Sequence, residues 1–337
     1  MNRGDALTDC CQLGTSGPLV ARVGFGCCPM GMYGWGVVTE SELMEAVREA
    51  LARGISFFDT ADVYGLGRSE ELLGRALGGR RNEAVIASKF GVRYDAQGRT
   101  KFDNSGKWIR SALDASLARL RTDRIDLYQL HYGDGQTPLD DVLSELDRAR
   151  SEGKIRYAGV TNVDLLAEGI DEPIPWLISF SHEYSLARRT SETAIQLTMN
   201  TLGMMFLSWG SLGQGILSGR YTGAEAFGDN DRRSRQVYRN FRGDDLSRCM
   251  RIVHYLQEIR PHYPGRSISQ LAVRWILDQL PGAIALVGIK RPEQLRDIAG
   301  ILDFRLHGEH HRQLDVLSSP PAGVTFGMGV NRDSVDA

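Results

Sequence analysis

Short apolar runs alternate with longer amphipathic segments over most of the 337-residue chain. The clearest run covers residues 55–58, follows Gly54 and ends at Asp59. A short, mainly apolar run is typical of a strand that is buried on both faces of a parallel sheet. Comparable runs predict eight strands, at about residues 19–26, 55–58, 84–88, 125–130, 155–160, 176–180, 204–208 and 284–287.

The segments between these runs have the 3.6-residue period of helices. Thr39 and Glu42 form a capping box, and apolar residues then recur at helical spacing until Gly54 ends the helix. Pro292 suits the first position of another helix. The same pattern predicts helices from about residue 69, at 107–120, 139–152, 245–260 and 267–279, and from residues 292 and 308.

Eight strand-then-helix units predict a closed (β/α)8 TIM barrel, a fold that reaches this length as one domain. We therefore expect a single domain over residues 1–337, with two extra helices. A turn-rich start predicts an N-terminal β-hairpin at about residues 8–19, and an irregular C-terminal tail is expected at about 319–337. Residues 91–106 read as a polar loop, and the Gly- and Arg-rich residues 210–240 as a functional loop.

Composition narrows the functional class. A formal net charge of −2 provides no basic field that would attract nucleic acid or an anionic membrane, so we expect small-molecule partners. The 5 cysteines lack the spacing of a zinc site, which favours reduced thiols, no metal and a cytoplasmic location. The N-terminal residues contain no apolar signal region, and no run approaches the ~20 apolar residues of a membrane span.

Polar or amphipathic residues follow the last apolar residue of six different predicted strands. In a barrel the carboxyl ends of all strands meet at one rim, where ligands bind. These residues are therefore expected to lie at one site, and they are Asp59, Lys89, His131, Asn162, Trp209 and Lys290.

Four residues together suggest proton transfer to a carbonyl group. A phenol has a pKa near 10, so Tyr64 needs a nearby cation such as Lys89 to stabilise the phenolate that remains after it gives up its proton. Asp59 could hold Lys89 in place, and His131 could bind the substrate oxygen. Each residue alone has a structural interpretation, as a turn residue, a core tyrosine, a satisfied histidine or half of a structural ion pair. Four at one rim favour the catalytic interpretation.

Several longer segments resemble the aldo-keto reductase family, from about residue 14 to residue 302. The family implies an NADPH-dependent barrel whose catalytic tetrad corresponds to Asp59, Tyr64, Lys89 and His131, with Tyr64 as the proton donor. The segments are 54–64 (GISFFDTADVY), 69–77 (SEELLGRAL), 87–90 (ASKF), 125–131 (IDLYQLH), 153–162 (GKIRYAGVTN), 207–219 (LSWGSLGQGILSG) and 288–297 (GIKRPEQLRD).

The same resemblance implies a site for NADPH/NADP+. Thr161 and Asn162 would hold the nicotinamide carboxamide, with Trp209 stacked on the ring. The pyrophosphate would lie on residues 210–215 under a flap drawn from residues 216–240. Cations next to a helix that starts at Pro292 favour NADPH over NADH. The chain departs from the family at Ser181, where a glutamine is usual, and at Ile298, where an asparagine is common. The implied cofactor residues are Thr161, Asn162, Ser181, Trp209, Gly210, Ser211, Leu212, Gly213, Gly215, Gly288, Lys290 or Arg291, Gln294 and Asp297.

The leading functional hypothesis is NADPH-dependent reduction of an aldehyde, ketone or keto-sugar to an alcohol. Tyr33, Trp35, Trp108 and Tyr132 are candidate walls of the substrate pocket. One alternative is an NADP(H)-binding regulatory protein, because the chain also resembles the potassium-channel β subunits, although the intact His131 favours catalysis. The other alternative is a pathway-specific reductase or dehydrogenase that acts on a non-carbonyl bond.

Overall fold

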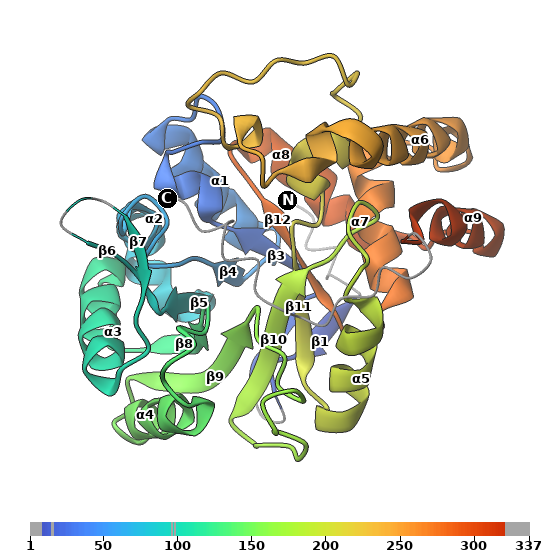
Figure 1. Ribbon diagram of the computed structural model, residues 1–337. Coiled ribbons are helices and arrows are strands. Elements are labelled where there is room, and N and C mark those ends of the chain that lie inside the picture. The colour runs from blue at the N-terminus through green and yellow to red at the C-terminus, as the bar shows by residue number, and fades with distance from the viewer. Residues whose placement is uncertain (1–8, 15–16, 96, 98, 321–337) are drawn as a thin grey trace.

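The chain folds as a closed barrel of eight parallel strands with helices around it, as the computed structural model shows (Figure 1). The structure describes residues 9–14, 17–95, 97 and 99–320. The barrel strands follow one another in chain order, and the last pairs with the first, which confirms the predicted (β/α)8 fold. They are β3 (Val23–Gly26), β4 (Phe57–Asp59), β5 (Val85–Phe90), β8 (Ile125–Leu130), β9 (Ile155–Thr161), β10 (Leu177–Glu183), β11 (Met205–Trp209) and β12 (Ile284–Gly288).

Helices follow most of these strands and bury their apolar stripes against the barrel. The outer layer consists of α1 (Glu40–Ala52), α2 (Arg68–Leu77), α3 (Gly106–Leu120), α4 (Leu139–Ser151), α5 (Glu192–Leu202), α7 (Ile268–Gln279) and α8 (Pro292–Ala299). Two further helices, α6 (Gly243–Ile259) and α9 (Gly308–Ser318), lie outside this alternation, as expected, and pack against each other. The predicted tail from residue 319 falls almost entirely outside the described residues.

The connection between β9 and β10 departs from the predicted alternation. The described residues 162–176 form turns rather than an α-helix. Gly169 has a φ of 85°, and Pro173 and Pro175 follow within six positions. A left-handed glycine followed by two prolines ends the single helical turn before it can extend.

The first predicted strand, 19–26, is divided into two, which corrects the single strand expected there. β2 (Leu19–Ala21) pairs antiparallel with β1 (Cys10–Gln12), which confirms the N-terminal hairpin, and only β3 joins the barrel. The division falls at Arg22, whose buried guanidinium donates hydrogen bonds of 3.0 Å to the carbonyl oxygens of Leu277, Leu280 and Ala283. These bonds therefore hold Arg22 at the point where the chain leaves the hairpin and enters the barrel.

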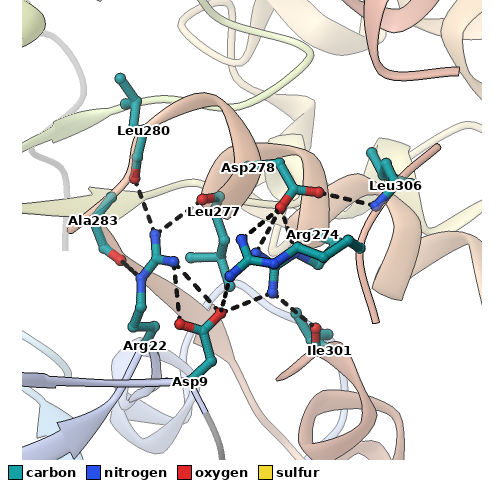
Figure 2. A network of polar contacts seen from close by, with 10 residues as sticks. Asp9, Arg22, Arg274, Leu277, Asp278, Leu280, Ala283, Ile301 and Leu306 are labelled. Atoms are coloured by element: carbon teal, nitrogen blue, oxygen red, sulfur yellow. Dashed lines mark hydrogen bonds and ion pairs between the residues drawn. The ribbon is translucent and has the colours of Figure 1, made fainter. Parts of the chain in front are cut away.

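The hairpin closes the amino-terminal end of the barrel. Leu13 and Val20 are 0% and 1% exposed and belong to the apolar cluster that fills the barrel interior. Figure 2 shows that Asp9, just before β1, accepts hydrogen bonds from both Arg22 and Arg274 of α7. Arg274 also bonds to Asp278 at 2.7 Å. Among the described residues, the hairpin and this polar network cover the amino-terminal end of the barrel interior.

A second hairpin stands at that opposite end, where the sequence predicts only a polar loop. β6 (Val92–Tyr94) pairs antiparallel with β7 (Thr100–Phe102). Val92 and Phe102 pack with Val63 and Tyr132 in a small apolar cluster, separate from the barrel interior. The hairpin thus fixes one wall of the open end.

Candidate active site

A cavity of about 850 Å³ opens among the carboxyl ends of the barrel strands. The loops after most of the barrel strands contribute to its walls, together with part of the 220–240 segment. The six strand-end residues singled out in the sequence all line this cavity: Asp59, Lys89, His131, Asn162, Trp209 and Lys290.

A buried ion pair joins the ends of β4 and β5. The Lys89 ammonium donates to both carboxylate oxygens of Asp59 at 2.8 Å, and to the carbonyl oxygen of Thr60 at 2.8 Å. The two side chains are only 4% and 7% exposed. Gln129 on β8 donates a further, longer bond to Asp59 at 3.5 Å. Because all three ammonium protons are used, the pair is held in one geometry and the cost of burying its charges is offset.

Tyr64 lies next to this pair, with its ring centroid 5.2 Å from the Lys89 Nζ atom. Burial raises the pKa of Tyr64 well above its ordinary value, the Asp59 charge adds to the increase, and the Arg232 guanidinium opposes it. The hydroxyl therefore remains protonated at neutral pH. The sequence predicts Lys89 as the cation near Tyr64, and the structure adds Arg232 as a second one.

His131 faces Tyr64 from the end of β8. The two ring centroids are 6.1 Å apart and the rings are nearly perpendicular, at 81°. Burial lowers the pKa of His131 well below 6.5, and the nearby Lys89 charge lowers it further, so the imidazole is neutral. Its buried Nδ1 atom has no hydrogen-bond partner among the described residues. A neutral imidazole of this kind can donate one N–H to a ligand oxygen.

Most of the residues assigned to the cofactor by resemblance also line the cavity. Two of the assigned residues do not line it. A Cβ atom added at Gly213 would meet the Ala187 side chain. The Arg291 side chain is 56% exposed at the N-cap of α8, and its Nε atom lies 3.4 Å from the Glu42 carboxylate. Those that line the cavity are Thr161, Asn162, Ser181, Trp209, Gly210, Ser211, Leu212, Gly215, Gly288, Lys290, Gln294 and Asp297, and so does Ile298.

The loop after β11 makes a series of left-handed turns. Gly210, Gly213 and Gly215 have φ values of 66°, 54° and 102°, and Gln214 has 56°. Ser211 anchors the loop by donating to the Leu286 carbonyl oxygen at 2.9 Å. Such turns point successive backbone N–H groups in one general direction, which is an arrangement that suits phosphate oxygens.

Ser181 does not reproduce the amide that is usual at its position. Its hydroxyl donates to the Thr161 hydroxyl at 3.0 Å, across the β9–β10 pair. Asn162 has a φ of 58°, which asparagine tolerates better than most residues, and its amide lies 3.4 Å from the His131 carbonyl oxygen. The departure at Ser181 is therefore absorbed within the strand ends without a buried unpaired hydroxyl.

Sequence reasoning did not single out five arginines that also line the cavity, namely Arg188, Arg220, Arg232, Arg233 and Arg239. Arg233 is 8% exposed and donates to Asp231 at 2.7 Å. Burial lowers the pKa of Lys290, and the Arg233 and Arg220 charges lower it further. The density of arginines in residues 210–240 was visible in the sequence, but a loop without periodicity does not show which way each side chain points.

Only some of the aromatic residues proposed as pocket walls lie in the cavity. Trp35 and Tyr132 line the cavity, whereas Tyr33 and Trp108 do not. Trp108 instead packs under the Arg93 guanidinium, 5.4 Å from its ring centroid.

The donor set fits a phosphorylated dinucleotide. Arg220, Arg233 and Lys290 bring three cations to one part of the cavity, which suits phosphate groups. Trp209 adds an aromatic ring to the cavity wall at the end of β11. In the described part of the chain, no helix combines the length and the apolar character that crossing a membrane requires.

Comparison with known proteins agrees with this architecture. The sequence model of the Aldo/keto reductase family matches residues 22–319. The chain is 30% identical to aldo-keto reductase YhdN of Bacillus subtilis (strain 168), over 96% of this chain and 99% of that one. It superposes on the glycerol dehydrogenase AKR11B4 of Gluconobacter oxydans with a TM-score of 0.83 at 28% identity, covering 95% and 99% of the two chains. An aldo-keto reductase of Klebsiella pneumoniae, solved in complex with NADPH, gives a TM-score of 0.71 at 25% identity, with 94% and 97% covered.

Proposed function

Because the chain belongs to the aldo/keto reductase family and is an NADP-dependent oxidoreductase, we propose that it reduces an aldehyde, ketone or keto-sugar to an alcohol, with Tyr64 as the proton donor. The observation that carries this proposal is the position of Tyr64. Its hydroxyl is kept protonated by burial, and it lies in the cavity between a buried Lys89–Asp59 pair and a neutral His131. We further propose that the whole chain acts as one barrel domain.

NADPH, when bound, supplies the hydride that the carbonyl carbon accepts. Tyr64 then donates its proton to the carbonyl oxygen, which completes the alcohol, and the phenolate that remains is reprotonated from solvent. Lys89 stabilises that phenolate, because its charge lies 5.2 Å from the ring centroid. His131 is neutral and can donate a hydrogen bond to the same carbonyl oxygen, which positions the substrate for proton transfer.

The cofactor would be held by the cavity residues that the resemblance assigns to it. Thr161 and Asn162 would bind the carboxamide, with Trp209 beside the ring. The loop from Gly210 to Gly215 would take the pyrophosphate, and Lys290 the 2′-phosphate, with Gln294 and Asp297 at the adenosine end. The cations Lys290, Arg220 and Arg233 support NADPH, because they line the same cavity and lie close enough for their charges to act on one another.

The decisive experiment is a substrate screen with the wild-type protein and Tyr64→Phe, followed through the absorbance of NADPH. We expect wild-type turnover of at least one aldehyde or ketone, and a loss of about 10²–10⁴-fold in kcat in the variant. NADPH binding, measured by quenching of protein fluorescence, should be retained. Turnover by Tyr64→Phe at the wild-type rate would remove the proton-donor assignment.

The same screen separates the alternatives. A regulatory, cofactor-sensing protein would bind NADPH without oxidising it in the presence of any carbonyl compound. A reductase specific for another kind of bond would consume NADPH only with an activated alkene or imine. The intact His131, which faces Tyr64, supports a catalytic role over a regulatory one.

A further inference from the structure

Two consecutive arginines in the loop over the cavity point to different halves of it. They begin the short 3-10 helix Arg232–Ser234. Arg233 lies over the Phe227 ring at 4.6 Å and bonds to Asp231. A Cβ atom added at Gly215 would lie 4.0 Å from the Arg233 guanidinium, so Arg233 lies beside the loop proposed to bind the pyrophosphate.

Arg232 turns the other way, toward the loop after β3. Its backbone N–H donates to the Gly34 carbonyl oxygen at 3.0 Å, and its guanidinium lies 5.8 Å from the Tyr33 ring centroid. Gly34 has a φ of 76°, and a Cβ atom there would clash with the Arg232 side chain. The glycine therefore leaves the space through which Arg232 reaches the cavity.

The Arg232 guanidinium is close enough to the candidate proton donor to act on it. Its charge opposes the increase in the pKa of Tyr64 and interacts with Cys28 and Tyr238, which both line the cavity. The cavity wall also includes the uncharged side chains of Trp35, Val63, Tyr132, Val237 and Tyr238, and the charges of Lys89 and Asp59 there are paired with each other. Arg232 thus brings a second cation, besides Lys89, close to Tyr64.

We propose that Arg232 is a specificity-determining residue that binds an anionic oxygen group, a carboxylate or a phosphate, on the carbonyl substrate. The inference rests on the proposed function and deepens it by naming the substrate class. A guanidinium is always charged and can bind two oxygens of one anion at once. Arg232 is half-buried, so water and salt screen an ion pair between its guanidinium and a bound anion less than they screen a pair at the surface. An anionic substrate should therefore bind more tightly than its neutral analogue.

The test compares matched substrates that differ only in charge. One pair is 4-carboxybenzaldehyde and its methyl ester, and the other is glyceraldehyde 3-phosphate and glyceraldehyde. For the wild type we expect a higher kcat/KM for the anionic member of at least one pair, and the pair that shows it identifies carboxylate or phosphate as the group. In Arg232→Gln this preference should fall about 10- to 100-fold, mainly through KM. Arg232→Lys should retain part of it, because a cation remains.

Arg235→Gln is the matched control. Arg235 lies in the same loop, and its guanidinium is 5.7 Å from the same Tyr33 ring, but it does not line the cavity. We expect this variant to keep the wild-type preference. Equal use of charged and neutral substrates by the wild type, or an unchanged preference in both Arg232 variants, would overturn the inference while leaving carbonyl reduction intact. Failure of the wild type to reduce any of the four compounds or any aldehyde, ketone or keto-sugar in the screen would overturn both.

Discussion

At the scale of single residues, Lys89 and Asp59 of the site carry charges, whereas Tyr64 and His131 stay neutral. Lys89 and Asp59 neutralise each other through two bonds of 2.8 Å, so neither charge needs water. Tyr64 and His131 are shifted in opposite directions, a raised pKa for the phenol and a lowered pKa for the imidazole, mainly by the same burial. Both are therefore neutral hydrogen-bond donors over the physiological range, which suits a carbonyl oxygen as the acceptor.

Asp62, two residues before Tyr64, should lower stability at neutral pH. Its Oδ1 atom is buried without a hydrogen-bond partner among the described residues, and burial, helped by Glu70, raises the pKa of its carboxyl well above 3.8. The folded state thus holds a proton that the unfolded state releases, so stability falls as pH rises from about 4 toward the folded pKa. Asp62→Asn should raise the free energy of unfolding at pH 7 by about 1–2 kcal/mol.

This prediction is checked by reversible denaturant unfolding of both proteins between about pH 4 and pH 8. The gain should shrink toward zero at the acid end, where the carboxyl is protonated in both states. A gain that is independent of pH would indicate a packing effect and contradict the titration argument.

Lys290 and its neighbour Arg291 offer a matched pair for the cofactor assignment. Lys290 lines the cavity near Arg233, whereas Arg291 is exposed and lies beside Glu42. Lys290→Ala should therefore weaken NADPH by about 10- to 100-fold and NADH much less, while Arg291→Ala changes either by only a few-fold. Equilibrium binding by fluorescence titration measures both. Equal losses of NADPH and NADH in Lys290→Ala would remove the 2′-phosphate assignment.

At the scale of elements, a chain of side-chain amides ties the loop over the cavity to the barrel. Gln214 donates to Glu183 at the end of β10 at 2.8 Å, and Asn240 donates to Gln214 at 2.6 Å. Asn240 is only 5% exposed and lies next to Arg239 and Phe241 in the 220–240 segment, which lines part of the cavity and is called the crossing segment below. The segment is thus held down at the loop proposed to bind the pyrophosphate.

Asn240→Ala should speed release of the cofactor. Without the bond to Gln214 the crossing segment loses one of its attachments, and opening of such segments often limits release. We expect the NADPH dissociation rate to rise several-fold in stopped-flow fluorescence, with little change in the association rate. Gln236→Ala, an exposed position of the same segment, is the control. An unchanged dissociation rate in Asn240→Ala would mean that the segment does not restrain the cofactor.

The elements that could be predicted from the sequence are those that depend on local pattern. Mainly apolar runs located all eight barrel strands, because a strand covered on both faces buries most of its side chains. The division at Arg22 escaped prediction because its cause is a set of carbonyl oxygens more than 250 positions away, with Ala283 at a separation of 261. The β6–β7 hairpin escaped because its residues alternate over only three positions on each strand.

The candidate site divides in the same way. Strand ends locate Asp59, Lys89 and His131, since the barrel topology alone decides where a strand end lies. The direction of Arg232 and Arg233 depends on the packing of a long loop against Gly34 and Phe227, which no periodicity reports. Residues on regular elements could therefore be placed from the sequence, and residues on the crossing segment could not.

At the scale of the whole molecule, the barrel is closed at one end by the N-terminal hairpin and open at the other. The closed end depends on charges as well as on Leu13 and Val20. Asp9 accepts a bond of 2.9 Å from Arg274, whose side chain is 0% exposed, and two longer bonds from Arg22 (Figure 2). One carboxylate thus links the start of the chain to α7.

Asp9→Asn should destabilise the fold without changing the chemistry. Burial acts to raise the pKa of Asp9, but the bonds and charges of Arg274 and Arg22 outweigh it, so the pKa is lowered. The carboxylate therefore contributes stability above the unfolded pKa, near pH 4, and this contribution is lost as pH falls through the folded pKa. At pH 7 we expect the free energy of unfolding of the variant to be lower by about 3 kcal/mol, because two buried guanidiniums lose a charged partner, and this deficit should shrink at acid pH.

Denaturant unfolding measures the loss of stability, with Asp123→Asn, an 86% exposed partner of Arg124, as the control. The kcat of the folded variant should match the wild type, because the network lies at the sealed end; a lower kcat would mean that the two ends of the barrel are coupled.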